Sequence, residues 1–292
     1  MGSAFERRTF DGSQLDSIEA FVDELSNGEM ASGWVAEVLG GVIGDRNAVC
    51  DLRREGDRVA VAISVDAFES EGNAAEVSMF ANNERAFVAL LDWAEQRVAS
   101  AGRDHLDIPA WPGCKLPAEL LATRGYRRSH VLYNMRRAPS AIAQPRVSLP
   151  AGWRWSPAAP SDARGYYETT RAAFHGMPSA FIASFEQFQE RLASFAPVPQ
   201  LLLSSAGDVA GFVRIAKNDD GSGVLDSLGR HPRHRGLGLG EHIVARGLGE
   251  LAALGAADVH LEVSATNEAG LALYRQFGFV VTSEVATYRR RL

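Results

Sequence analysis

Apolar residues recur at helical spacing in two parts of the chain. Val244, Leu248 and Leu251 follow the i, i+4, i+7 pattern of one helix face, which predicts a helix over 241–254 that ends at Gly255. A matching stripe of four apolar residues lies in the first half, at Phe87, Leu91, Ala94 and Val98. Further helices are expected at 161–174, 178–193 and 267–277.

Short apolar runs bounded by turn residues predict strands. In the second half they fall at 152–155, 200–204, 209–217, 223–228 and 259–263, followed by a final pair of strands between 279 and 291. The first half repeats this order. The expected class is α/β (α+β), in which each half is a mixed, mostly antiparallel sheet with a parallel pair in the middle and helices on its faces.

A sequence repeat supports this division into halves. Residues 101–108 match 256–263 at an offset of 256 − 101 = 155, and Gly56-Asp57 matches Gly207-Asp208 at 207 − 56 = 151. The second copy therefore carries 155 − 151 = 4 extra residues, which fall around 230–235. A Pro/Ala/Ser-rich stretch separates the copies. We expect a first domain at 1–138, a linker at 139–151 and a second domain at 152–292.

Composition and charge narrow the class of protein. The 292 residues are 46% hydrophobic and 23% charged with a net charge of −6, which excludes a disordered chain and argues against binding nucleic acid or an anionic membrane. No apolar run reaches about 18 residues, so we expect no transmembrane helix or signal peptide and a cytoplasmic location. The two cysteines, Cys50 and Cys114, and the seven histidines show no metal-ligand spacing, so no metal is expected.

The most unusual segment runs from Leu228 to Glu241. A strand enters a loop with glycines at alternate positions, Gly236, Gly238 and Gly240, and the loop opens directly onto a helix. Glycines let backbone N–H groups approach an anion, and the helix dipole adds positive potential, so the segment predicts a phosphate cradle. Three arginines and two histidines within 230–235 add positive charge. A glycine-rich turn beside a solvated charged loop is the plainer alternative.

Two common nucleotide motifs do not fit this segment. A dinucleotide site has the pattern G-x-G-x-x-G, but Glu241 stands where the last glycine belongs when counting begins at Gly236. A P-loop needs Gly-Lys-Ser/Thr, which is missing. A Rossmann oxidoreductase is therefore a remote alternative.

The segment Arg235-Gly236-Leu237-Gly238-Leu239-Gly240 fits the acyl-coenzyme A motif R-x-x-G-x-G. Downstream, Asn267, Leu273-Tyr274 and Phe277-Gly278-Phe279 follow the pattern N-x-x-A-x-x-L-Y-x-x-x-G-F, with Gly270 where alanine is usual. In these two motifs the chain resembles the GNAT superfamily of acyl-coenzyme A-dependent N-acetyltransferases over about residues 152–292. The whole chain then resembles tandem members of that superfamily, with two GNAT-like domains.

The resemblance implies the roles of several residues. Acetyl-coenzyme A is the expected acyl donor, bound by the residues of the cradle and the pantetheine site: Leu228, Gly229, Arg230, Arg235, Gly236, Leu237, Gly238, Leu239, Gly240, Asn267 and Tyr274. Tyr274 is the implied general acid for the leaving thiolate, although a half-buried helix tyrosine is the alternative. Asn267 is also explained as a helix N-cap. A backbone N–H near Arg230 is the implied donor to the oxyanion.

An acceptor amine must lose a proton before it attacks the thioester. Asp226 and Glu262, on neighbouring predicted strands, are the candidate bases, each with ion pairing as the alternative role. Five residues are candidates to line the acceptor site, although aromatic residues at helical spacing more often pack in a core: Tyr166, Tyr167, Phe174, His175 and Phe181. Direct transfer in a ternary complex is favoured over a covalent cysteine route, because Cys50 lies in a predicted buried strand.

The first copy lacks these features. Phe80-Ala81-Asn82-Asn83-Glu84-Arg85 replaces the glycine motif, and Leu121 matches Tyr274, so we expect a degenerate domain without the cofactor site. The sequence thus predicts an N-acetyltransferase acting on the primary amine of a small molecule. The alternatives are acetylation of a protein or peptide, and a non-catalytic acyl-coenzyme A sensor. We expect a monomer, with a homodimer as the alternative.

Overall fold

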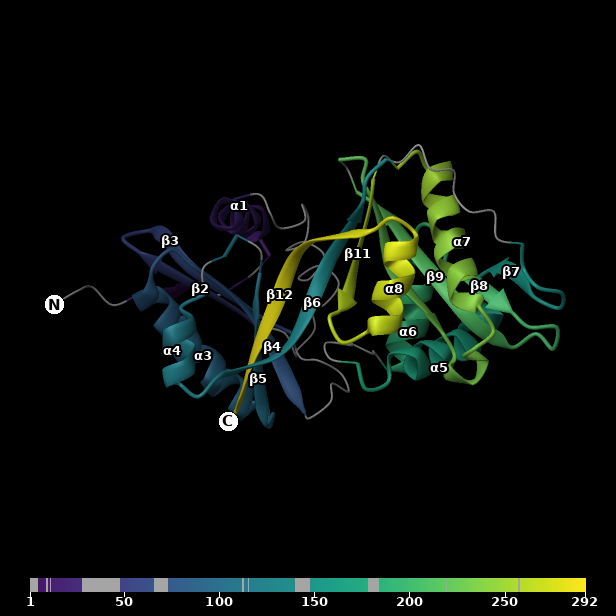
Figure 1. Cartoon of the computed structure of the whole chain (residues 1–292). Coiled ribbons are helices and arrows are strands. Elements are labelled where there is room, and N and C mark those ends of the chain that lie inside the picture. Colours follow the sequence, from purple (N-terminus) through teal and green to yellow (C-terminus); the bar gives the residue numbers. More distant parts are fainter. Residues whose placement is uncertain are drawn as a thin grey trace. The chain divides into compact units, whose positions relative to one another are not determined.

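The computed structural model describes residues 5–8, 10, 12–27, 48–65, 73–111, 113–114, 116–139, 148–177, 184–218, 220–256 and 258–292. The chain forms two compact units (Figure 1). Unit 1 comprises Met1–Val131 and Val285–Leu292, and unit 2 comprises Leu132–Glu284. Both are mixed α/β, as the sequence predicts.

In unit 1 the strand order is β1-β2-β3-β4-β5-β12. The strands are β1 (Glu6–Arg8), β2 (Ala48–Arg54), β3 (Asp57–Val65), β4 (Ala74–Ala81), β5 (His105–Ala110) and the last part of β12 (Val280–Arg291). The β4–β5 pair is parallel and the other pairs are antiparallel. Helices α1 (Leu15–Ser26), α3 (Glu84–Ser100) and α4 (Ala118–Thr123) complete the unit.

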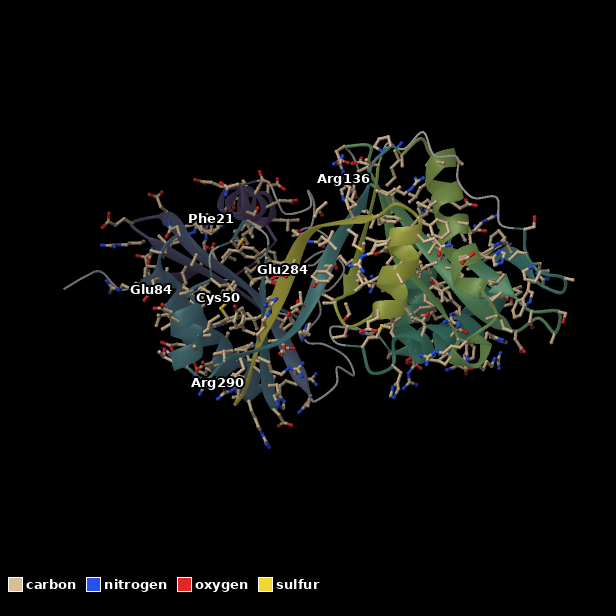
Figure 2. All side chains as sticks on the ribbon, in the orientation of Figure 1. Phe21, Cys50, Glu84, Arg136, Glu284 and Arg290 are labelled. Carbon is tan, nitrogen blue, oxygen red and sulfur yellow. The ribbon has the colours of Figure 1, made fainter. Side chains whose placement is uncertain are left out.

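The predicted helix stripe of the first half lies in α3. Phe87, Leu91, Ala94 and Val98 are all buried and pack in one cluster with residues of β2 to β5. Cys50, labelled in Figure 2, belongs to the same cluster, and burial raises the pKa of its thiol to about 11. A protonated, buried thiol is a poor nucleophile, and the choice of a direct route over a covalent one stays a prediction.

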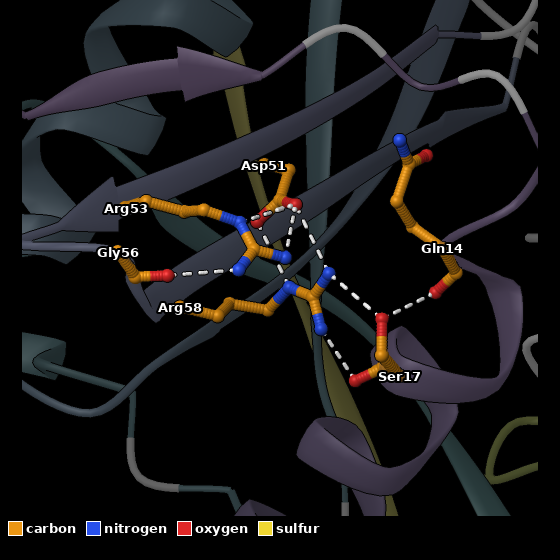
Figure 3. A network of polar contacts seen from close by, with 6 residues as sticks. All are labelled: Gln14, Ser17, Asp51, Arg53, Gly56 and Arg58. Carbon is orange, nitrogen blue, oxygen red and sulfur yellow. Dashed lines mark hydrogen bonds and ion pairs between the residues drawn. The ribbon is translucent and has the colours of Figure 1, made fainter.

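A buried ion pair connects α1 to the β2–β3 hairpin (Figure 3). Asp51 on β2 is 2% exposed and accepts hydrogen bonds from Arg58 on β3, at 2.8 Å and 3.0 Å, and from Arg53. The same Arg58 guanidinium donates to the Oγ and the main-chain oxygen of Ser17 in α1. The guanidinium thereby neutralises the buried carboxylate and positions the helix.

In unit 2 the strand order is β6-β11-β10-β9-β8-β7. The strands are β6 (Arg127–Arg137, of which 132–137 lie in this unit), β7 (Arg154–Pro157), β8 (Gln200–Leu203), β9 (Val209–Lys217), β10 (Gly223–Arg230) and β11 (Val259–Ser264). β10 and β11 are parallel, and the remaining pairs are antiparallel. The unit therefore has the parallel pair in the middle of its sheet.

Helices cover both faces of this sheet. On one face, α7 (Leu239–Ala253) and α8 (Glu268–Gln276) pack on alternate strand residues such as Val213, Leu225 and Leu261. On the other, α5 (Ala163–Phe174) and α6 (Phe185–Leu192) pack on Leu201, Leu203 and Phe212. Strand side chains alternate between the two faces of a sheet. These contacts therefore show to which face the side chains of β8 to β11 point. Short 3-10 turns lie at Pro160–Asp162 and Pro232–His234.

The last strand differs from the prediction. The expected pair of strands between 279 and 291 is wrong: the segment is one continuous strand, β12. Its first residues lie in unit 2 and its last in unit 1, where Ala286–Arg291 pair with β5. Arg289 binds Asp107, and Arg290 (Figure 2) donates to Glu95 of α3 at 2.6 Å. Conversely, Leu132–Arg137 of the first sequence copy pair with β11 in unit 2.

The boundaries of the two compact units therefore differ from the boundaries of the two sequence copies. Each unit contains a terminal strand from the other copy, so its sheet depends on residues distant in sequence. The division into 1–138, 139–151 and 152–292 stays a prediction about the sequence copies. No helix in the described part of the chain is long and apolar enough to span a membrane.

Candidate active site

A bulge and a separation of strands create the site. β10 shifts register against β9 between Val224, which pairs with Ala216, and Ser227, which pairs with Arg214, so β10 carries one extra residue there. Among the described residues, β10 and β11 pair only at Gly223–Val259 and Val224–His260. Both strands then continue, to Arg230 and Ser264, without pairing with each other, while β10 stays paired with β9 and β11 with β6. The backbone groups of β10 that point toward this gap have no hydrogen-bond partner on β11. A backbone N–H must be unpaired in this way to donate to an oxyanion.

The glycine loop follows the free end of β10. Gly236 and Gly238 have φ of +81° and +68°, and a Cβ at either would meet nothing within 4 Å. Gly238 is the N-cap of α7, while Leu239 is fully buried and anchors the helix to the sheet. Within the described part of the chain, the N–H groups of Gly236, Leu237 and Gly238 donate no hydrogen bond. The loop is thus an open set of donors at a helix N-terminus, which fits an anionic phosphate.

Positive side chains surround this loop. Arg230 donates to the main-chain oxygen of His234 at 3.2 Å, and burial and the neighbouring Arg235 lower the pKa of its guanidinium. Arg235 has no carboxylate partner among the described residues and is exposed. Arg233 instead forms an ion pair with Asp208 at 3.4 Å. Burial, followed by Arg233, lowers the pKa of both His231 and His234, which favours their neutral forms.

Tyr274 comes from α8 and is 8% exposed. Its ring packs edge-on against Phe279 with a centroid distance of 6.1 Å, and its hydroxyl makes no hydrogen bond within the described part of the chain. Burial raises the pKa of this phenol to about 12, so it keeps its proton at neutral pH. A general acid must carry a proton and be able to donate it to the ligand. The Tyr274 hydroxyl is protonated and makes no hydrogen bond to a described residue, so it meets both conditions.

Asn267 is the N-cap of α8. Its Oδ1 accepts a hydrogen bond of 3.0 Å from Gly270 N, so the capping role is present in the structure. A Cβ at Gly270 would lie 2.6 Å from Asn267 Nδ2, which explains glycine at this position of the motif. The predicted contact of Asn267 with the pantetheine arm stays a prediction.

The two candidate bases lie on the same face of the sheet. Their neighbours Leu225, Leu261 and Val263 pack toward α7 and α8, so Asp226 and Glu262 point to the opposite face, which α5 covers over β9 and β10. Asp226 forms an ion pair with Arg214 of β9, a residue that the sequence analysis did not single out. In the sequence, Arg214 stands out only as a charged residue within an otherwise apolar strand. The structure places Glu262 in β11 opposite Asn134 of β6.

The aromatic residues predicted for the acceptor site mostly pack together. Tyr166 lies 5.0 Å from Phe188 and 5.1 Å from Phe212 between ring centroids, and burial raises its pKa to about 12. Tyr167 packs on Phe185 and Phe188, and Phe174 on Phe212. His175 is exposed at the end of α5, and Phe181 lies outside the described residues. Packing thus accounts for Tyr166, Tyr167 and Phe174, and the acceptor role of all five stays a prediction.

The corresponding region of unit 1 has side-chain hydrogen bonds at its helix N-terminus and beyond the paired part of its parallel strands. Asn83, the N-cap of α3, accepts a hydrogen bond from Ala86 N at 2.9 Å, so a side chain engages the helix N-terminus. β4 and β5 pair in parallel from Ala74 to Glu76, and beyond these pairs Trp111 Nε1 donates to Ser78 Oγ at 2.9 Å. Leu121, the counterpart of Tyr274, is fully buried. Sequence patterns did not reveal the Trp111–Ser78 contact.

The chain is similar to known acetyltransferases. Residues 164–279 match the family model described as acetyltransferase (GNAT) family. A mycothiol acetyltransferase of Thermobispora bispora is 30% identical over 195 residues, 64% of this chain and 64% of that protein. Another, from Clavibacter michiganensis subsp. michiganensis, is 32% identical over 179 residues, 59% of this chain and 57% of the relative. These alignments span less than two thirds of either relative.

Solved structures agree in fold over nearly the whole chain. A GCN5-related N-acetyltransferase from Sphaerobacter thermophilus has a TM-score of 0.74 at 18% identity, covering 98% of this chain and 95% of that one. A tandem GNAT protein from the clavulanic acid biosynthesis pathway has a TM-score of 0.72 at 15% identity, covering 99% and 98%. The fold of two GNAT-like domains predicted from the sequence is therefore confirmed, and residues 164–279 match the acetyltransferase (GNAT) family model.

Proposed function

We propose that this chain is an N-acetyltransferase that transfers the acetyl group of acetyl-coenzyme A to the primary amine of a small molecule. The observation that carries the proposal is the open donor loop at Gly236–Gly238, which stands at the free end of β10 where the parallel strands separate. The pyrophosphate fits the N–H groups and positive end of α7, with Arg230 and Arg235 nearby. Leu228, Gly229, Leu237, Leu239, Gly240 and Asn267 complete the proposed coenzyme site.

The arrangement supports direct transfer in a ternary complex. A thioester in the gap between β10 and β11 would have Tyr274 on the side of α8 and the carboxylates of Asp226 and Glu262 on the side of α5. The free amine attacks the carbonyl carbon, a backbone N–H near Arg230 stabilises the resulting oxyanion, and Tyr274 protonates the thiolate as the C–S bond breaks. Preorganised donors of this kind lower such barriers by roughly 3 kcal/mol each.

The relatives favour a small-molecule acceptor. The relatives from Thermobispora bispora and Clavibacter michiganensis are mycothiol acetyltransferases. We therefore propose the desacetyl form of mycothiol, or a similar small amine, as the acceptor. The aromatic residues of α5, with His175 and Phe181, are the proposed acceptor side of the site. Acetylation of peptides and a non-catalytic coenzyme sensor are the competing functions.

The test combines binding with turnover. We expect acetyl-coenzyme A to bind in calorimetric titration while NAD does not. Thiol release is then measured with desacetyl mycothiol, glucosamine and a short peptide with a free α-amine. Faster turnover with the small amines supports the proposal, and a preference for the peptide contradicts it. Binding without turnover on any of them indicates a sensor.

A further inference from the structure

An ion pair and a tyrosine hydroxyl lie on the face of the unit 2 sheet that α5 covers. Arg214 of β9 pairs with Asp226 of β10, and their side chains are 24% and 33% exposed. Tyr166 of α5 packs its ring against Phe188 and Phe212. Packing accounts for the ring, but the Tyr166 hydroxyl makes no hydrogen bond with a described residue. This face therefore presents a carboxylate, a guanidinium and an unengaged hydroxyl.

The hydroxyl lies within reach of both charges of the ion pair. Burial raises the pKa of the Tyr166 phenol to about 12, and the two charges act on the same group: Arg214 lowers its pKa and Asp226 raises it. The hydroxyl therefore keeps its proton at neutral pH, and it can both donate and accept a hydrogen bond. Tyr166 is only 2% exposed, and a polar group in such a place normally has a hydrogen-bond partner. A bound ligand would supply that partner.

The fold does not require a charged residue at position 214. Gly56 and Gly207 lie in matching hairpin turns, so the strands that follow them match at an offset of 207 − 56 = 151. Position 214 therefore corresponds to 214 − 151 = 63, and Ile63 is fully buried in a cluster with residues of α1. Apolar residues in place of a partly buried ion pair usually cost no stability. The Arg214–Asp226 pair thus points to a role other than folding.

Asp226 lies at a distance from the expected reaction centre. The proposed oxyanion donor is a backbone N–H near Arg230, at the free end of β10. Strand residues advance by about 3.3 Å, so the 230 − 226 = 4 steps from Asp226 to Arg230 span roughly 10 Å once the bulge is allowed for. A base takes a proton over about 3 Å, or through one water. Asp226 is therefore better placed to contact the rest of the acceptor than its reacting amine.

The charges of the pair favour a neutral ligand group. Among the described residues neither Arg214 nor Asp226 has a second ion-pair partner, so the two charges offset each other. The guanidinium carbon of Arg214 lies 4.5 Å from the centroid of the Phe195 ring, which holds the cation in place. A hydroxyl group donates as well as accepts. Hydroxyls of a ligand can therefore donate to Asp226, accept from Arg214 and do either with Tyr166.

On the basis of the proposed function, we propose that Arg214, Asp226 and Tyr166 bind hydroxyl groups of the acceptor. The acceptor class is then a hydroxyl-bearing primary amine, such as an amino sugar. The three residues determine specificity and contact the acceptor beside its reacting amine. This assignment removes Asp226 from the candidate bases. It adds Arg214 to the acceptor site and gives the Tyr166 hydroxyl a partner.

The test compares two ring amines that differ in their hydroxyl groups. Glucosamine and cyclohexylamine both carry a primary amine on a six-membered ring, but only glucosamine carries hydroxyls. Thiol release at one pH gives the ratio of kcat/KM for glucosamine to that for cyclohexylamine, and comparing this ratio between chains cancels the different basicity of the amines. In Tyr166→Phe and in the double variant Arg214→Ile with Asp226→Val, we expect the ratio to fall by about 10-fold or more, chiefly through KM for glucosamine. The double variant removes both charges together, so neither is left unpaired.

Two control variants and the wild type separate this inference from the proposed function. Tyr288→Phe removes a phenol hydroxyl beside the core cluster of unit 1 and should leave the ratio unchanged, whereas Tyr274→Phe should lower both kcat/KM values and keep their ratio. If Tyr166→Phe and the double variant, shown to be folded by circular dichroism, lower kcat/KM equally for both amines or not at all, the inference is overturned. A wild type that acetylates desacetyl mycothiol but neither ring amine also overturns it and leaves the proposed function standing. A wild type that acetylates none of the three contradicts the function as well.

Discussion

Asn267 Oδ1 accepts a 3.0 Å hydrogen bond from Gly270 N, and a Cβ on residue 270 would reach within 2.6 Å of the same side chain. The cap of α8 and the glycine in its first turn are therefore mutually dependent. Alanine at 270 favours the helix by about 1 kcal/mol but displaces a cap that contributes about the same.

Non-additive stabilities should follow from this contact. Gly270→Ala alone should change the free energy of unfolding by less than about 0.5 kcal/mol, whereas in an Asn267→Ala background it should stabilise by about 1 kcal/mol. Urea unfolding of the four chains measures the coupling. Equal effects in both backgrounds would show that the cap and the glycine are independent.

The donor loop should fail when a carboxylate enters it. Gly238→Glu places a charged side chain at the N-cap of α7, where nothing lies within 4 Å of a Cβ. We expect acetyl-coenzyme A affinity to fall by at least about 100-fold, or about 2.7 kcal/mol. Gly255→Glu is the matched control, because Gly255 has a φ of +72° near +68° at Gly238 but lies beyond the other end of the helix. Comparable affinity in the two variants would exclude the loop as the phosphate site.

The chain should bind one acetyl-coenzyme A. In unit 1, Asn83 caps the helix that corresponds to α7, and Trp111 contacts Ser78 beyond the paired part of β4 and β5. Calorimetric titration of the full chain is expected to give a stoichiometry of one, falling to zero in Gly238→Glu. A second site that survives this substitution would show that unit 1 retains a binding function.

Tyr274→Phe should separate chemistry from binding. The Tyr274 hydroxyl has no hydrogen-bond partner in the described part of the chain, so its removal should change the melting temperature little. Because burial raises the pKa of this phenol to about 12, it remains protonated through the neutral range. We expect kcat to fall about 100-fold with an unchanged coenzyme dissociation constant. An unaffected kcat in Tyr274→Phe would assign thiolate protonation to another group.

Stability in acid should depend on His130 of β6. Burial first, and then Arg289, lower the pKa of this imidazole from its ordinary 6.5, although Asp107 acts in the opposite direction. Below about pH 6.5 the unfolded chain therefore takes up a proton that the folded chain resists, so this contribution is present above that pH and is lost as pH falls. The urea midpoint should drop between pH 7.5 and 5.5, and less so in His130→Gln. If the urea midpoint falls equally in the wild type and in His130→Gln, the loss of stability in acid comes from other groups.

Much of the architecture was predictable because it is local. Helix stripes such as Phe87 to Val98 are set by the spacing of apolar residues, and the donor loop by glycines that tolerate positive φ. The repeat offset and the positions of Asp226, Glu262 and Tyr274 on their elements also follow from order along the chain, and the loss of the cofactor site in the first copy stays a prediction. The aromatic residues of α5 were ambiguous, since one spacing serves both packing and a binding surface.

The amino-acid sequence by itself thus determined most of the helices and strands and the two copies, and it predicted the chemistry of the second copy. Only the tertiary structure decided which strands complete each sheet, that Arg214 holds Asp226, and that Glu262 stands opposite asparagine where Asp107 stands opposite arginine. The physical reason is range. Helix periodicity and turn conformation depend on neighbours a few residues apart. The Arg214–Asp226 pair joins two different strands, and the register of β5 with β12 and of β6 with β11 joins residues separated by more than a hundred positions.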